Sequence, residues 1–369
     1  MSSGLALALL ITVSSLAALL SAAIAAYSLV RSRFVTEGLE EEVNKLRKWL
    51  NESAVYLNGL PATNARKKNL ILYSALKLYS EEKYAKAIPA LRDASLLATE
   101  DDERCAFLNL VGLSQIKGGN LLDAEKTFLE MIVLAENKEL DEALAAALGN
   151  MGYIYFVQSD LSQALDFLQK ALKIDEETKN LRGQARDLGY IGKAYFALAE
   201  QKKVFNNYKK AFEHYEKALK IHEETDYREG QARELGNIGG FYLAIGDSRK
   251  ALDYYEKALD VAAEIDNLEL QFNHLNGLAI INKTLKNDSK ALACYEKSLR
   301  IAERMPDPGI KAGTLAKMGA LCIEMRNYKY ALDCFQKARD IYAKTGPADK
   351  VDACNSSINL ARQSLNGHS

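Results

Sequence analysis

The residue types that most often carry out chemistry are sparse and scattered in this chain. It has five cysteines and four histidines. No two cysteines form a CxxC pair and no histidine belongs to an HExxH motif, the spacings typical of zinc and catalytic metal sites. No GxxxxGK[ST] loop is present to bind a phosphate. The sequence therefore predicts no metal site, no cofactor and no enzymatic activity.

The cysteines have a structural interpretation instead. Their number is odd and their spacing is wide, which does not suit a disulfide framework. We therefore expect them to be small apolar residues packed within helices. They are Cys105, Cys294, Cys322, Cys334 and Cys354.

The charge balance favours no nucleic-acid partner. Lys plus Arg number 48 and Asp plus Glu number 49, so the formal net charge is −1. A nucleic-acid-binding chain usually carries a clear excess of basic residues. We expect no nucleic acid among the partners.

A stretch without charge, residues 4–30, stands near the N-terminus. A helix of this length spans about 40 Å, which exceeds the roughly 30 Å hydrocarbon core of a bilayer. We predict a transmembrane helix. A cleaved signal peptide is the alternative, although no basic residue precedes the run. Arg31 and Arg33 follow it, which predicts an N-terminus outside and everything after the span in the cytoplasm.

Residues 36–58 read as a juxtamembrane amphipathic helix. Its apolar stripe has helical spacing, and the rest of the segment is charged. Two interpretations stay open: packing against the first repeat, or a short parallel coiled coil. Fewer than three heptads favour packing. The stripe consists of Leu39, Val43, Leu46 and Leu50.

Internal repeats dominate the rest of the sequence. KIDEETKNLRGQARDLG at 173–189 returns as KIHEETDYREGQARELG at 220–236. A shorter unit opens with alanine about every 40 residues; in most copies an aromatic residue stands four positions later and a second alanine seven positions later, and a small residue usually stands twelve positions ahead. Each unit predicts a helical hairpin whose small residues let two backbones approach, and hairpins must stack to bury a core. The opening alanines are Ala87, Ala124, Ala164, Ala211, Ala251, Ala291 and Ala331.

These spacings resemble the tetratricopeptide repeat. The LGN-x-G motifs at 148–152 and 235–239, with the period near 40, are similar to the longer-helix subtype. That subtype includes Leu-Gly-Asn-type polarity adaptors and bacterial sensor modules. The resemblance implies an all-α fold, an α-α superhelix of about seven hairpins over 62–345. A final amphipathic stretch at 348–365 predicts a capping helix.

One unit is longer than the others. Seven extra residues fall around 197–207, close to two helical turns. Shared between the two helices, they would lengthen each by one turn. We predict a protruding hairpin tip at this point.

The resemblance also implies a binding face. Tetratricopeptide arrays bind extended peptides or helices along a concave face lined by the first helix of each hairpin. Asparagine pairs with backbone amides, arginine with carboxylates, and aromatic rings form apolar pockets. Carried onto this chain, the groove candidates are Asn150, Tyr153, Phe156, Arg186, Lys193, Phe196, Arg233, Asn237, Asn273 and Asn276.

Two of these candidates have an equally good structural interpretation. Arg186 and Arg233 occur in the duplicated block, and in this interpretation they only pair with Glu177 or Glu224 across the turn between repeats. The functional prediction is a membrane-anchored scaffold that binds a protein or peptide partner. A peptide-responsive sensor and a membrane-associated assembly or translocation helper remain as alternatives.

Overall fold

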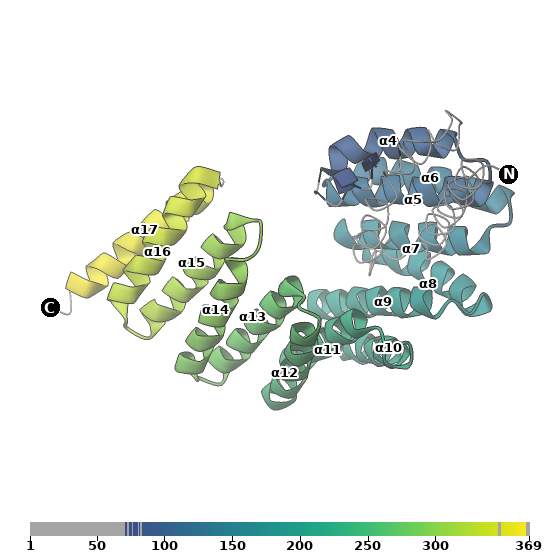
Figure 1. Ribbon diagram of the computed structural model, residues 1–369. Helices are drawn as coiled ribbons and strands as arrows, with labels where there is room; N and C mark the ends of the chain where they lie inside the picture. Colours follow the sequence, from purple (N-terminus) through teal and green to yellow (C-terminus); the bar gives the residue numbers. More distant parts are fainter. Residues whose placement is uncertain are drawn as a thin grey trace, which may run out of the picture. The chain divides into compact units, whose positions relative to one another are not determined.

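The computed structural model describes residues 71, 74, 75, 77–79, 81, 83–345 and 348–366. These residues form helices joined by short turns, with no strand among them, so the all-α prediction is confirmed for this part of the chain (Figure 1). The predicted segments at 4–30 and 36–58 lie outside the described residues. Within the described ranges, no helix is both long enough and apolar enough to cross a membrane.

The helices follow one another as hairpins. Their bounds are α4 (Tyr84–Leu96), α5 (Asp101–Lys117), α6 (Leu121–Asn137), α7 (Asp141–Val157), α8 (Leu161–Glu177), α9 (Leu181–Lys202), α10 (Phe205–Glu224), α11 (Arg228–Ala244), α12 (Ser248–Glu264), α13 (Leu268–Thr284), α14 (Asp288–Ala302), α15 (Pro308–Glu324), α16 (Tyr328–Thr345) and α17 (Ala348–Asn366).

Local sequence explains where the helices stop and start. Between α7 and α8, Ser159 has φ of +65°, and the Asp160 N–H donates to the Tyr155 carbonyl at 2.9 Å. This left-handed residue closes the end of α7 in a Schellman-type turn. The Asp160 side chain then accepts from the Gln163 N–H at 3.1 Å and caps α8. Similar turns recur along the chain.

Small residues let the two helices of a hairpin approach, as the sequence predicts. A Cβ on Gly152 would lie 2.5 Å from Leu168 Cγ, so α8 packs directly on the α7 backbone. A Cβ on Gly112 would lie 2.4 Å from the Phe128 ring in the preceding hairpin. The opening alanines of the second helices are fully buried. This prediction is confirmed.

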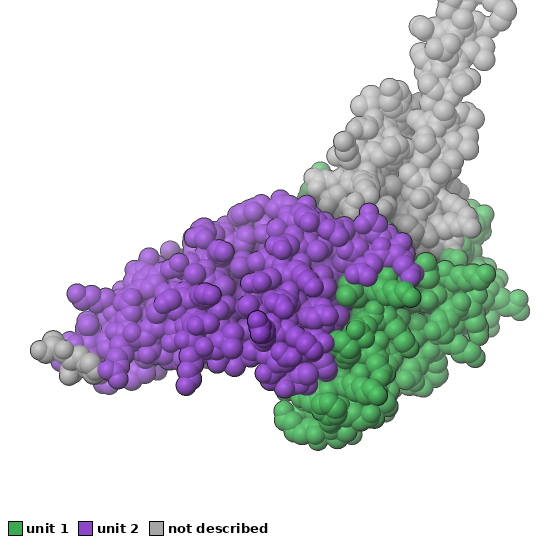
Figure 2. All heavy atoms as spheres, turned by 90° about the horizontal axis from the view of Figure 1, so that it is seen from below, with its two compact units in different colours: residues 1–221 green, residues 222–369 purple. Residues whose placement is uncertain are grey.

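The chain divides into two compact units, residues 1–221 and 222–369 (Figure 2). In unit 1, α7 contacts α5 and α9 as well as its own partner α8. In unit 2, α11 contacts α13 in the same way. The first helices of successive hairpins therefore form a layer of their own inside each unit.

The fourth hairpin is longer than its neighbours. Its helices α9 and α10 have 22 and 20 residues, whereas α7 and α8 have 17 each. Only Lys203 and Val204 separate them. The predicted lengthening of both helices is confirmed.

Helix α17 covers the last hairpin of unit 2. Its buried residues Cys354, Ile358 and Ala361 face α16, with Ile358 and Ala361 in a cluster with Phe335. The rest of α17 is polar, which suits a helix with one face exposed to solvent.

Candidate functional site

Unit 1 gathers three aromatic rings and one lysine on its layer of first helices. Tyr153 and Phe156 come from α7, and Tyr190 and Lys193 come from α9. The Tyr190 ring lies 5.2 Å from the Tyr153 ring, edge to face, and 6.4 Å from the Phe156 ring. Lys193 Nζ lies 4.7 Å from the centre of the Tyr190 ring. All four are half-buried, and we call this group the aromatic ledge.

Helical spacing explains why these side chains meet. Residues 153 and 156 share one face of α7, as do 190 and 193 on α9, because residues three apart lie one turn from each other. The two helices contact each other. Core packing of α7 is supplied by other residues, including the fully buried Met151 and Ile154.

The ledge suits a ligand of mixed character. Partly exposed aromatic rings offer apolar area with little loss of side-chain freedom, and tyrosine hydroxyls add hydrogen bonds. The ammonium group of Lys193 adds a positive charge beside them. An apolar side chain with a nearby carboxylate fits this chemistry.

Phe196 lies apart from the ledge, toward the end of the lengthened hairpin. Its ring meets the Tyr208 ring of α10 at 5.8 Å, edge to face. The Tyr208 hydroxyl donates to the Glu200 carboxylate. Phe196 therefore helps to hold α9 and α10 together.

Two of the predicted groove residues in unit 1 lie inside the unit. Asn150 is buried, and its amide donates to Asn109 Oδ1 at 2.9 Å, which links α7 to α5. Arg186 is only 3% exposed. In this conformation both side chains take part in packing between hairpins, which is the structural interpretation left open for Arg186.

Arg186 belongs to a buried cluster of charges. Its Nε and Nη2 both lie 2.7 Å from Asp187 Oδ1, and Nη2 lies 4.0 Å from Asp175 Oδ2. A Cβ on Gly149 of α7 would lie 2.2 Å from Nη2, so only glycine leaves room for the guanidinium. Glu177, the partner considered from sequence, is 3.9 Å from Lys173 instead.

Burial governs the protonation of this cluster. It raises the pKa of Asp187 to about 7, against the opposing effect of the Arg186 guanidinium. Burial also raises the pKa of Asp175, whose carboxylate accepts from the Asn180 amide at 2.8 Å. Two carboxyl groups facing one guanidinium favour retention of a proton.

The candidates in unit 2 are distributed differently. Arg233 Nη2 donates to Glu229 at 2.7 Å, one turn back on α11. The Asn237 amide donates to Glu234 at 3.0 Å, and Asn273 on α13 is exposed. Arg233 and Asn237 are half-buried, so parts of both face solvent.

Asn276 is buried in unit 2 and joins three helices. Its amide donates to the Phe272 carbonyl at 2.8 Å and to Ser298 Oγ at 3.0 Å. Its oxygen accepts from Lys317 Nζ at 3.1 Å. Asn276 thus links α13 to α14 and α15, and the Lys317 contact brings this network to the surface.

Four of the five cysteines are buried, as the sequence predicts, and Cys294 is half-buried. Burial raises the pKa of Cys105 and of Cys334 to about 12. Such thiols stay protonated at neutral pH and are poor nucleophiles.

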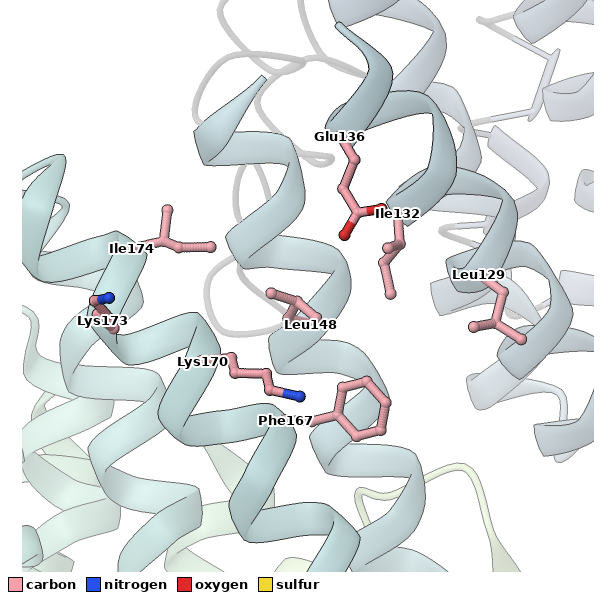
Figure 3. Close-up of a pocket in the computed structure, with 8 residues that line it drawn as sticks. All are labelled: Leu129, Ile132, Glu136, Leu148, Phe167, Lys170, Lys173 and Ile174. Carbon is pink, nitrogen blue, oxygen red and sulfur yellow. The ribbon is translucent and has the colours of Figure 1, made fainter. Parts of the chain in front are cut away.

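Sequence reasoning missed two features of unit 1. One is Tyr190, which stands forty residues after Asn150 at the same position of the next first helix. The other is a groove of about 460 Å³ between the second helices α6 and α8, with Leu148 of α7 in its lining (Figure 3). Its lining consists of Leu129, Ile132, Glu136, Leu148, Phe167, Lys170, Lys173 and Ile174.

An exposed apolar stripe on α6 borders this groove. Leu122, Leu129 and Val133 are 63%, 45% and 58% exposed. The equivalent positions of α8 hold Ser162, Gln169 and Lys173. Apolar residues on α6 at positions that are polar on α8 are the sequence feature from which this groove could have been predicted.

A comparison with protein families decides what kind of repeat this is. Three overlapping segments match the Tetratricopeptide repeat family, at residues 143–213, 190–264 and 232–304. Residues 143–304 therefore consist of tetratricopeptide repeats. The matched tetratricopeptide segments cover the aromatic ledge and the unit 2 candidates. No curated protein matches the chain in sequence.

Solved structures share the tetratricopeptide fold at low sequence identity. A Rap protein complexed with Competence and Sporulation Factor aligns at 14% identity and a TM-score of 0.61, over 95% of this chain and 100% of that one. NprR in complex with its cognate peptide NprX aligns at 16% and 0.56, over 90% and 100%. BtubC from P. vanneervenii aligns at 20% and 0.52, over 62% and 91%. These likenesses concern the fold alone.

Proposed function

We propose that this chain is a protein-interaction scaffold whose unit 1 binds an extended peptide or a helix of a partner on the aromatic ledge. The ledge itself carries the proposal, because three rings and an ammonium group gather there, half-exposed, on first helices. Aromatic residues near the centre of a surface often supply most of the binding free energy. The ligand we expect has an apolar side chain and a carboxylate.

A peptide-responsive sensor is the second candidate. The observation that favours it is the fold likeness to NprR, whose structure was solved with its cognate peptide NprX, and to a Rap protein complexed with Competence and Sporulation Factor. A sensor would change its compactness when a short peptide binds, whereas a scaffold would hold a folded partner. Small-angle X-ray scattering of the full chain, with and without ligand, separates the two. A helper that handles unfolded clients is the third candidate, and it would bind many unrelated segments.

We also propose that residues 4–30 anchor the array to a membrane, with the N-terminus outside and the repeats in the cytoplasm. The uncharged stretch and the following Arg31 and Arg33 support this orientation. N-x-S/T sequons occur in the repeats, for example at Asn282 and Asn287. Expression in a eukaryotic host tests the orientation, since a glycan on either asparagine would contradict it.

The ledge is tested by affinity capture with paired variants of the full chain. Tyr153→Ala with Tyr190→Ala removes two half-buried rings of the ledge and should lower partner capture at least tenfold. Tyr155→Ala is the matched control: it removes a half-buried tyrosine of the same helix, whose ring stacks on Phe167 at 5.3 Å. Circular dichroism melting of each variant checks that all of them fold.

The control separates loss of binding from loss of stability. If the double variant loses the partner and Tyr155→Ala keeps it, the ledge is the binding surface. If both variants keep the partner, or if Tyr155→Ala alone loses it, the assignment is wrong.

A further inference from the structure

The tip of the lengthened hairpin exposes two apolar side chains side by side. Val204, in the turn, is 42% exposed, and Phe205, the first residue of α10, is 72% exposed. The Asn207 N–H donates to the Val204 carbonyl at 3.0 Å, so the backbone of this turn is ordered around them. The sequence predicts the protrusion but not its chemistry.

The other hairpin turns differ at this position. In five of them the residue before the second helix is Asn or Asp, and before α4 it is Lys83. The Asn or Asp side chain accepts a backbone N–H of the helix in four cases: Asn120, Asp160, Asp247 and Asn327. The Val204 side chain has no oxygen atom that could accept such a hydrogen bond. An apolar residue at this position costs about 1 kcal/mol of helix stability relative to Asn or Asp. Folding of the hairpin therefore does not explain the apolar tip.

Lysines surround the two apolar residues. Lys202 and Lys203 precede them and Lys209 follows, all exposed. Lys210 lies over the Tyr195 ring, with Nζ 4.9 Å from its centre. No acidic residue occurs between positions 200 and 213. The tip is thus locally basic in a chain whose net charge is −1.

The nearest carboxylates neutralise this charge only in part. Glu200 lies 3.3 Å from Lys203 and also accepts from the Tyr208 hydroxyl. Glu213 lies 3.8 Å from Lys209. Ion pairs this exposed are weak and rearrange readily. The lysines can therefore turn toward an external anion.

From this combination we infer that the tip docks on an anionic bilayer surface, with Val204 and Phe205 in the headgroup region and the lysines at lipid phosphates. Aromatic and aliphatic side chains gain free energy at this depth, and lysines keep their charge in water while their stems cover apolar area. A bilayer accepts an exposed ring without a matched pocket. An acidic protein would need a pocket for Phe205, and nucleic acid would need a wider basic surface.

The docking requires lipid charge as well as the apolar residues. One lysine near an anionic surface changes the docked fraction by about fivefold, and two apolar side chains alone bind weakly. The tip uses none of the aromatic ledge, so the partner-binding proposal and this one stand or fall separately.

Tryptophan fluorescence of the full chain in vesicles tests the inference. The chain has one tryptophan, Trp49, so Trp49→Phe with Phe205→Trp places a single reporter at the tip. Vesicles contain phosphatidylcholine alone or with about 30% phosphatidylserine, and brominated acyl chains quench a reporter that enters the bilayer. Gln158→Trp in the same background is the control, because this exposed residue precedes an equivalent turn.

The Gln158→Trp control separates docking of the tip from tethering of the whole chain by residues 4–30. If residues 4–30 hold the chain in the membrane, both reporters are kept near it, but only the docked tip reaches the acyl chains. We expect at least twofold quenching for Phe205→Trp in vesicles with phosphatidylserine, and little in phosphatidylcholine or for Gln158→Trp. Adding Lys202→Glu, Lys203→Glu and Lys209→Glu should abolish the quenching.

Three results would overturn the inference: no quenching of the tip reporter with phosphatidylserine, equal quenching of both reporters, or quenching that survives the three lysine reversals. The first, combined with a blue shift of the tip reporter on addition of an acidic protein or an RNA, would assign the tip to that partner instead. Since Phe205 is exposed, its replacement should leave the melting temperature of the chain nearly unchanged.

Discussion

The duplicated block gives the molecule an internal comparison. Residues 175–187 in unit 1 and 222–234 in unit 2 are identical at seven of 13 positions, yet their shared arginines differ in environment. Arg186 is buried against Asp187, whereas the side chain of Arg233 is 20% exposed and pairs with Glu229. Two arginines at equivalent positions of the repeat thus lie in different electrostatic environments.

One substitution accounts for much of this difference. The residue one turn before Arg233 is Glu229, and the equivalent residue before Arg186 is Arg182. A glutamate four residues before an arginine attracts it along the helix surface, while an arginine repels it. Arg186 therefore turns toward the interior, where Asp175 stands at the position of His222.

Contacts that occur in both blocks show which interactions the repeat requires. Gln184 Nε2 donates to the Asp175 carbonyl at 2.8 Å, and Gln231 Nε2 donates to the His222 carbonyl at 3.0 Å. These bonds link a second helix to the next first helix in both units, whatever side chain stands at the accepting residue. Backbone contacts preserve the hairpin geometry, and side chains at the remaining positions are free to differ.

The largest expected contrast comes from removing each arginine. Arg186→Met leaves Asp175 and Asp187 buried without their guanidinium, which should lower the free energy of unfolding by about 3–5 kcal/mol. Arg233→Met removes one partly exposed ion pair and should cost less than about 1 kcal/mol. Urea unfolding of the two full-length variants measures both. Equal losses would mean that the two arginines play the same role.

A pH dependence should follow from Asp187 in unit 1. Its pKa of about 7 in the folded state exceeds that of an unfolded aspartate, so the folded protein binds the extra proton. The stability from this group is complete below pH 4 and falls as the pH rises toward 7. Asp187→Asn should therefore stabilise the protein at pH 8 relative to pH 5 by roughly 1–3 kcal/mol. The measurement is the variant-minus-wild-type difference in urea unfolding; a difference independent of pH would contradict it.

Unit 2 should respond to acid in the opposite sense. Burial lowers the pKa of His274 to about 4, and a Cβ on Gly236 would lie 2.5 Å from its Cε1 atom. Below pH 6.5 the unfolded chain takes up a proton that folded His274 refuses, so stability falls as the pH drops from 6.5 to 4. His274→Leu should remove roughly 1–2 kcal/mol of this dependence.

Hydrogen–deuterium exchange assigns each effect to its unit. On acidification, amides of α9 should become better protected and amides of α13 less protected. His274→Leu should remove the change in α13 and leave α9 as it was. A change shared equally by both helices would contradict separate titrations.

The smallest contrast lies in the turns of the two blocks. Lys179 has φ of +57° and Asp226, its equivalent, has φ of +49°. Glycine adopts this conformation without strain, and aspartate tolerates it better than lysine. Lys179→Gly should stabilise the protein by about 0.5–1 kcal/mol and Asp226→Gly by less, as thermal unfolding would measure. Destabilisation by either change would show that the side chain makes a compensating contact.

Periodicity made the hairpins of this chain predictable. Buried alanines and the small residues opposite them recur at fixed spacing, because every hairpin solves the same packing problem. The lengthened fourth hairpin followed from the count of residues alone. Tyr153, Phe156 and Lys193 could be selected because they break the repeat.

Other parts of the site depend on contacts that no spacing encodes. Asn150 looked like a binding residue, but Asn109 in the preceding hairpin pairs with its amide. Asn276 likewise finds Ser298 and Lys317 on other helices. Burial of these polar side chains depends on partners 22 to 41 residues away, which helical register does not specify.

Site-specific photo-crosslinking tests the partner-binding surface most directly. A photoreactive phenylalanine analogue replaces Tyr190 on the ledge, Tyr155 between α7 and α8, or Leu129 in the groove between α6 and α8, in the full chain expressed in its own cells. We expect a partner to be crosslinked at position 190 and not at positions 155 and 129. A partner captured from position 129 and not from 190 would contradict it and place binding on the second helices.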